Sequence, residues 1–159
     1  MISRPSQLVF VDRPTLQRVE REMRRVAREH RLTALGLIDR TGLLLAAVGD
    51  LPLPPDQMGA TAAGVFSAVS AIVHPAEGFE FTVQLASGGI HLHFREVDPR
   101  LFLCAFYMDP ATSLSCSSVL RDLSELASHL LADQTADKRK LGNLELITEK
   151  LDELFSKPN

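Results

Sequence analysis

Eight consecutive apolar residues, Leu101 to Met108, place the strongest constraint on how this chain can fold. Successive side chains of a β-strand point to opposite faces of its sheet, so a strand that is apolar at every position needs cover on both faces. The rest of the chain can supply that cover, because it contains helical as well as strand-like patterns. The run therefore predicts a central strand in a layered α/β domain.

The other patterns predict the helices and strands around it. Apolar residues at 3.6-residue spacing predict helices over residues 15–30, 56–73 and 112–131. Alternating or short apolar segments predict strands over residues 34–38, 43–48, 79–86 and 90–95. Five strands with helices on the faces predict an α/β sandwich with a largely antiparallel sheet, formed by residues 1–131.

The C-terminal part of the chain is predicted to lie outside this domain. Residues 132–142 are interpreted as a polar linker, and Asn143 as the cap of a separate amphipathic helix within residues 143–159. The apolar stripe of that helix consists of Leu144, Ile147, Leu151, Leu154 and Phe155. The stripe is a candidate partner-binding surface, although the helix could also dock on its own domain or fray.

Charge and composition argue against several classes of partner. A net charge of −3 gives no reason to expect nucleic acid. The longest uncharged run, residues 59–73, is shorter than the roughly 20 residues of a membrane-spanning helix, and residues 1–7 contain no apolar signal core. Cys104 and Cys116 lie in apolar or small-residue stretches, which is typical of buried free thiols. We expect a soluble cytoplasmic protein without membrane insertion.

Sequence motifs for catalysis and cofactor binding are incomplete. Gly59 and Gly64 have the spacing of a phosphate loop, but the next two residues are apolar where that loop needs lysine and serine or threonine. His91 and His93 share a strand face without a clear third zinc ligand, and we interpret them as an exposed pair. The chain is therefore predicted to have no catalytic site, metal or cofactor of its own.

One alternative is a hydrolase that uses the serines near the start of the third helix. These are Ser113, Ser115, Ser117 and Ser118. A nucleophilic serine would need a histidine base within hydrogen-bond reach, whereas hydroxyls at a helix start commonly cap free N–H groups.

The outer face of the first helix is rich in arginine. It carries Arg18, Arg21, Arg24, Arg25 and Arg28. Because Glu20, Glu22 and Glu29 are interspersed, this face is interpreted as a solvated one with ion pairs between successive turns.

The second helix carries two apolar stripes. The stripe predicted to face the sheet consists of Met58, Ala62, Val65, Val69 and Ile72. The other is made of small residues around one aromatic: Gly59, Ala63, Phe66, Ser70 and Val73. A helix that is apolar on two sides favours contact with another chain on the second side, with a deeper core contact as the alternative. These five residues are the candidate partner-binding site.

Several of these segments resemble roadblock (dynein light chain-like) domains. Residues 35–49 resemble the first hairpin of that family, and the small-residue second helix and residues 109–114 fit it as well. The likeness extends over most of the chain, from Gln7 to Phe155. It implies a roadblock/longin-like α/β sandwich and a homodimer whose second helices lie together on one face of a continuous sheet.

The two ends of the chain resemble, more narrowly, bacterial roadblock proteins that regulate a small Ras-like GTPase in cell polarity or motility. This resemblance implies a GTPase-activating partner that supplies no arginine finger and instead holds the GTPase's own catalytic groups in place. The second-helix stripe and the C-terminal stripe would then contact the GTPase or a second subunit. The alternative is a scaffold that links polarity or motility proteins without activating the GTPase.

Overall fold

A computed structural model describes residues 11–73, 76 and 78–155, with side chains described as far as Asp133. The chain forms three helices and five strands over this part. The helices are α1 (Arg13–Glu29), α2 (Pro55–Val73) and α3 (Thr112–Phe155). The strands are β1 (Ala34–Asp39), β2 (Leu44–Gly49), β3 (Glu80–Leu85), β4 (Ile90–Asp98) and β5 (Leu101–Tyr107).

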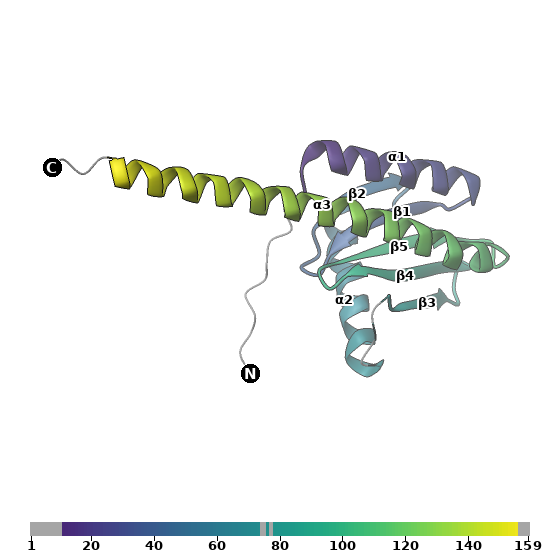
Figure 1. The fold of residues 1–159 in the computed structure, drawn as a ribbon. Coiled ribbons are helices and arrows are strands. Elements are labelled where there is room, and N and C mark those ends of the chain that lie inside the picture. Colours follow the sequence, from purple (N-terminus) through teal and green to yellow (C-terminus); the bar gives the residue numbers. More distant parts are fainter. Residues whose placement is uncertain (1–10, 74–75, 77, 156–159) are drawn as a thin grey trace.

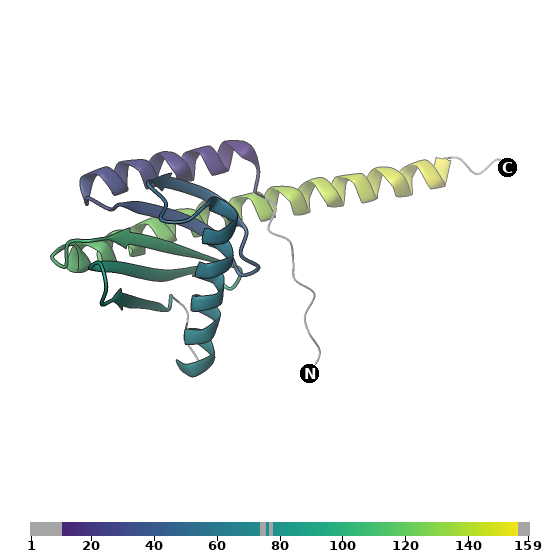
Figure 2. The ribbon, with the colours of Figure 1, turned by 180° about the vertical axis from the view of Figure 1, so that it is seen from behind.

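The strands form one sheet in the order β2-β1-β5-β4-β3, and every neighbouring pair is antiparallel. Strand β5 lies in the middle, as its apolar run predicts. Leu103 and Tyr107 pack on one face with α1 and α3, whereas Phe102 and Phe106 pack on the other with α2. The two views of the ribbon show α1 and α3 on one side of the sheet and α2 on the other (Figures 1 and 2). The predicted α/β sandwich is confirmed.

The turn between β1 and β2 is fixed by a buried carboxylate. Oδ1 of Asp39 accepts hydrogen bonds from the backbone N–H groups of Thr41 and Leu43, at 2.8 and 2.9 Å, and from the Thr41 hydroxyl at 2.6 Å. Gly42 has a φ of +95°, which a residue with a side chain rarely adopts. This turn determines where α2 can lie.

Helix α3 differs from the prediction. It runs without a break from Thr112 to Phe155, so residues 132–142 are helical and do not form a linker. The segment is polar, but it contains no proline and consists mostly of residues that are compatible with a helix. The far half of α3 projects away from the domain (Figure 1). Whether residues 143–159 act as a separate unit stays a prediction.

The side chains of the predicted C-terminal stripe lie outside the described part of the chain. No helix among the described residues is long and apolar enough to cross a membrane.

Candidate functional site

The five candidate residues on α2 do not share one free surface. Gly59, Ala63 and Phe66 are buried against the sheet, Ser70 is half-buried, and Val73 is exposed. The prediction that Gly59, Ala63 and Phe66 face a partner is therefore wrong. Small residues do allow a second backbone to approach this helix, but that backbone is the protein's own β1–β2 turn.

Gly59 marks the point of closest approach. A Cβ atom built on Gly59 would lie inside van der Waals contact of the Gly42 carbonyl oxygen, and the Leu44 nitrogen would be 3.3 Å away. Only glycine lets the helix come so close to the turn. The first half of α2 is thereby held on the β1–β2 hairpin.

Phe66 lies in an aromatic cluster between α2 and the sheet. Its ring stacks on Phe102 at a centroid distance of 4.5 Å and an interplanar angle of 18°, and Phe79, Phe81 and Phe94 surround it. The guanidinium carbon of Arg40 lies 4.2 Å from the Phe66 centroid, and Arg40 also pairs with Glu96 at 2.6 Å. Phe66 is a core residue that helps to hold α2 on the sheet.

The outer face of α2 is formed by other residues. Beyond its first turn, its exposed positions are Ala60, Thr61, Gly64, Ser67, Ala68, Ala71, Ile72 and Val73. Ile72 is 78% exposed and Val73 51% exposed, although the sequence prediction placed Ile72 against the sheet. The only charged residue of the helix is Asp56 in its first turn. An exposed helix face without charge is typical of a surface that another protein covers.

One of the two edges of the sheet lies beside this face. Among the described residues, strand β3 pairs only with β4, so one side of its backbone has no partner strand there. Figure 2 shows α2 crossing the strands, with its last turns reaching the edge formed by β3. An apolar groove of about 220 Å³ adjoins this region. It is lined by Pro52, Leu53, Met58, Thr61, Ala62, Val65, Leu85, Ile90, Leu92 and Phe106.

The opposite face of β3 and β4 is polar and lies under α3. The Glu80 carboxylate accepts hydrogen bonds from Ser117 at 2.8 Å and from Arg95 at 2.9 Å. Partial burial opposes ionisation of Glu80, but these two bonds and the positive charge of Arg95 help to hold the pKa of this carboxyl below its usual value. Nε2 of His93 lies 3.5 Å from Glu80, and burial lowers the pKa of His93 despite that neighbour. His93 is therefore neutral at pH 7.

Neither histidine of β4 is exposed, so that part of the sequence interpretation is wrong. His91 stacks on Tyr107 at a centroid distance of 5.1 Å, and His93 is enclosed beneath α3. No group of three or more potential metal ligands occurs among the described residues. Burial raises the pKa of Cys116 to about 12 and that of Cys104 well above its usual value, so neither thiol is a nucleophile at neutral pH.

The serines of α3 do not form a nucleophile–base pair in the part of the chain that the structure describes. Ser117 donates to Glu80 and Ser115 to the carbonyl oxygen of Thr112, and neither hydroxyl is hydrogen-bonded to a histidine. This arrangement does not support the hydrolase alternative. That the protein has no catalytic site of its own stays a prediction.

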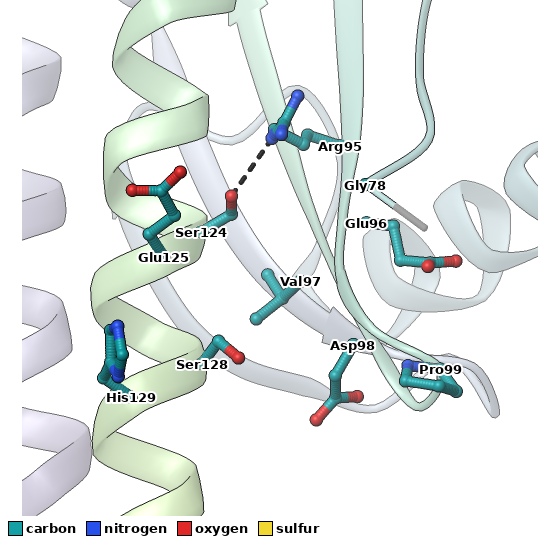
Figure 3. A pocket seen from close by; sticks show the side chains of 10 residues that line it. All are labelled: Gly78, Arg95, Glu96, Val97, Asp98, Pro99, Ser124, Glu125, Ser128 and His129. Atoms are coloured by element: carbon teal, nitrogen blue, oxygen red, sulfur yellow. Dashed lines mark hydrogen bonds between the residues drawn. The ribbon is translucent and has the colours of Figure 1, made fainter. Parts of the chain in front are cut away.

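A polar cavity of about 350 Å³ lies between the end of β4 and α3 (Figure 3). Arg95 on its wall is already hydrogen-bonded to Ser124, at 3.0 Å, and Asp98 accepts bonds from the turn that follows β4. Arg95, Ser124 and Asp98 are thus already bonded within the fold, and we assign the cavity no ligand.

Solved structures with the same arrangement of elements are known. Myxococcus xanthus MglB matches with a TM-score of 0.66 and 17% identity, over 79% of this chain and 96% of that one. The gliding protein MglB of Thermus thermophilus matches with a TM-score of 0.63 and 18% identity, over 82% and 99%. The Roadblock/LC7 domain from Streptomyces avermitilis matches with a TM-score of 0.56 and 18% identity, over 67% and 91%.

The chain has a roadblock fold.

The likeness is clearest in three dimensions. No family model matches the sequence, and no curated protein sequence matches it either. At these identities the roadblock fold is shared while most side chains differ. The outer face of α2 and the β3 edge must therefore be judged from this chain's own residues.

Proposed function

We propose that the protein is a dimeric, cytoplasmic regulator of a small Ras-like GTPase of the MglA type, in bacterial cell polarity or motility. The observation that carries this proposal is a roadblock fold matched over nearly the full length of two MglB chains. The uncharged outer face of α2 beside a free strand edge supports it, because it offers a surface for a protein rather than a pocket for a substrate.

The regulator would act by holding the switch loops of the GTPase in the arrangement that favours hydrolysis. GTP hydrolysis depends mainly on aligning the attacking water and stabilising the charge of the phosphates. A rigid surface that binds the switch loops of the GTPase in their productive arrangement raises the rate without adding a catalytic residue. A sheet layered between helices is suited to this role.

Mixing the protein with the MglA-like GTPase of the same organism tests the proposal. We expect the single-turnover rate of GTP hydrolysis to rise by about tenfold or more, and the protein alone to hydrolyse no GTP. Binding that prefers the GTP-loaded form but leaves the rate unchanged would instead favour the scaffold alternative. Failure to bind either nucleotide form would contradict both.

The dimer would form through the β3 edge and the outer face of α2. An unpaired strand edge can pair with the same edge of a second copy, and this would bring the two α2 helices together. Ile72 and Val73 lie at the end of α2 closest to that edge, where they would pack against the second subunit. Gly64 and Ala68 on the same face would let the two helices approach closely.

Replacing Ile72 by aspartate should weaken this dimer. Because Ile72 is 78% exposed in the single chain, the change opens no core cavity, but it would place a charge inside the proposed interface. We expect the dissociation constant to rise at least tenfold, measured by sedimentation velocity over a dilution series. Leu114→Asp is the matched control, since Leu114 is 88% exposed on α3, which covers the other face of the sheet. Equal weakening by both variants would contradict the α2 interface.

The C-terminal stripe is proposed as a second contact. Leu144, Ile147, Leu151, Leu154 and Phe155 would bind the GTPase or a neighbouring subunit from the projecting end of α3. An amphipathic helix that extends away from its own domain is suited to bind in a groove of a partner.

A further inference from the structure

The outward face of α1 is rich in arginine. Val19, Met23, Val26 and Ala27 face the core, so the opposite side of the helix faces solvent. The exposed positions on that side include Arg13, Arg18, Arg21, Arg24 and Arg28. No exposed aromatic or large aliphatic side chain interrupts them, and no other helix or strand in the described part of the chain covers this side of α1 (Figures 1 and 2).

Two of the three glutamates of α1 pair away from this face, and the third, Glu20, makes no ion pair among the described residues. Glu22 and Glu29 both pair with a single residue, Arg25, at 3.0 and 2.8 Å. They line the groove between α1 and α3 together with Asp122. Among the described residues, the five arginines named above make no ion pair. Ion pairs between successive turns were expected on the outer face of α1, and among the described residues they occur only at Arg25.

Helix α1 is also positively charged, whereas the whole chain is negatively charged. Residues 13–29 contain six arginines and three glutamates, a net charge of +3, whereas the complete chain carries −3. The rest of the chain therefore carries −6. A cationic face on an acidic protein orients the molecule towards an anionic surface instead of attracting anions from all sides.

Three kinds of anionic partner could face such a helix. A specific protein interface has an apolar or aromatic centre that excludes water, and this face has none. Single-stranded nucleic acid would need aromatic stacking platforms, and duplex DNA would need residues that follow a groove. A fluid layer of anionic lipid headgroups can bind a helix that has only long cationic side chains along one side, because the lipids rearrange around them.

We propose that α1 docks the protein peripherally on an anionic membrane surface. The arginines from Arg13 to Arg28 span about 22 Å along the helix, so a flat surface can meet them together. Helix α1 covers β2, at the end of the sheet opposite β3. The dimer proposed above would leave both copies of this face open. The inference does not depend on GTPase regulation.

Sedimentation with lipid vesicles tests this inference on the full chain. We expect binding to vesicles of phosphatidylcholine containing about one third phosphatidylglycerol, no binding to pure phosphatidylcholine, and release by high salt as screening increases. Replacing Arg21, Arg24 and Arg28 together by glutamine should lower the partition coefficient about a hundredfold, since each basic residue near the surface strengthens binding about fivefold. All three side chains are exposed, so the fold should persist, and circular dichroism checks this.

The matched control removes the same charge elsewhere. Lys138, Arg139 and Lys140 form a second basic run, and their replacement by glutamine should leave vesicle binding within about twofold. The inference is overturned if the wild-type protein does not bind anionic vesicles, or if the control loses binding as strongly as the α1 variant. Tighter binding to a DNA duplex than to the vesicles at the same salt would likewise overturn it, in favour of nucleic acid.

Discussion

Replacing Gly59 by alanine should destabilise the protein by about 3 kcal/mol or more, the upper range for overpacking a well-packed site. The added methyl group would collide with the Gly42 carbonyl oxygen. That oxygen belongs to a backbone turn whose position is fixed by three hydrogen bonds to Asp39, so it cannot rotate away as a flexible side chain would. Either α2 moves off the hairpin or the turn is distorted.

Gly64 provides the control within the same helix. A Cβ atom on Gly64 would meet no heavy atom within 4 Å. In the single chain, at protein concentrations too low for a dimer, Gly64→Ala should therefore be stabilising by about 0.5–1 kcal/mol, because glycine in a helix interior loses more backbone entropy on folding than alanine does. Urea denaturation of both variants measures the contrast. If Gly59→Ala were as stable as the wild type, α2 would not lie against the β1–β2 turn.

Replacing Phe66 by alanine should lower the free energy of unfolding by about 3–5 kcal/mol. The change would leave a cavity among Phe79, Phe81, Phe94 and Phe102, and would remove the ring against which Arg40 lies. Phe66 is fully enclosed, so its neighbours can collapse only in part.

The same variant distinguishes a core residue from an interface residue. Ile72→Ala, on the same helix but largely exposed, should change the stability of the single chain by less than about 0.5 kcal/mol. Thermal and urea melts at low protein concentration measure both variants. A Phe66→Ala protein that keeps its stability but loses its partner would contradict the core assignment, and would restore the interpretation of Phe66 as an interface anchor.

Local patterns determine much of this fold. The apolar run of β5 is enough to predict a central strand with cover on both faces. Asp12, just ahead of Pro14, caps α1, with Oδ1 2.8 Å from the Thr15 nitrogen. Helix periodicity and strand alternation then give all eight elements in order. These features depend on residues that are close together in sequence.

The orientation of α2 could not be predicted in this way. Both of its stripes are apolar, so periodicity does not indicate which one meets the sheet. Which stripe meets the sheet depends on the contact between Gly59 and Gly42. These two residues belong to different elements, so their contact leaves no pattern within the helix itself. The absence of charge beyond Asp56 is the signal within the helix that supports the proposal of a partner on its outer face.

The polar segment 132–142 shows a second reason why prediction from the sequence can fail. Polarity is the usual mark of a linker, but a helix on the protein surface tolerates polar residues on all sides when none of them breaks it. The arginines of α1 show the same kind of limit, because a sequence counts charges without showing that Glu22 and Glu29 both contact Arg25.

Because α3 is continuous, the movement of its far end relative to the domain is restricted. At 1.5 Å per residue, residues 132–155 form a rod about 35 Å long, not a tether of variable length. A tether lets its end sample many positions, whereas a rod fixes both the distance and the direction at which anything held there must sit. Movement of a molecule bound at the tip would therefore be transmitted to the domain as a tilt of α3 over β4, which the first half of α3 covers.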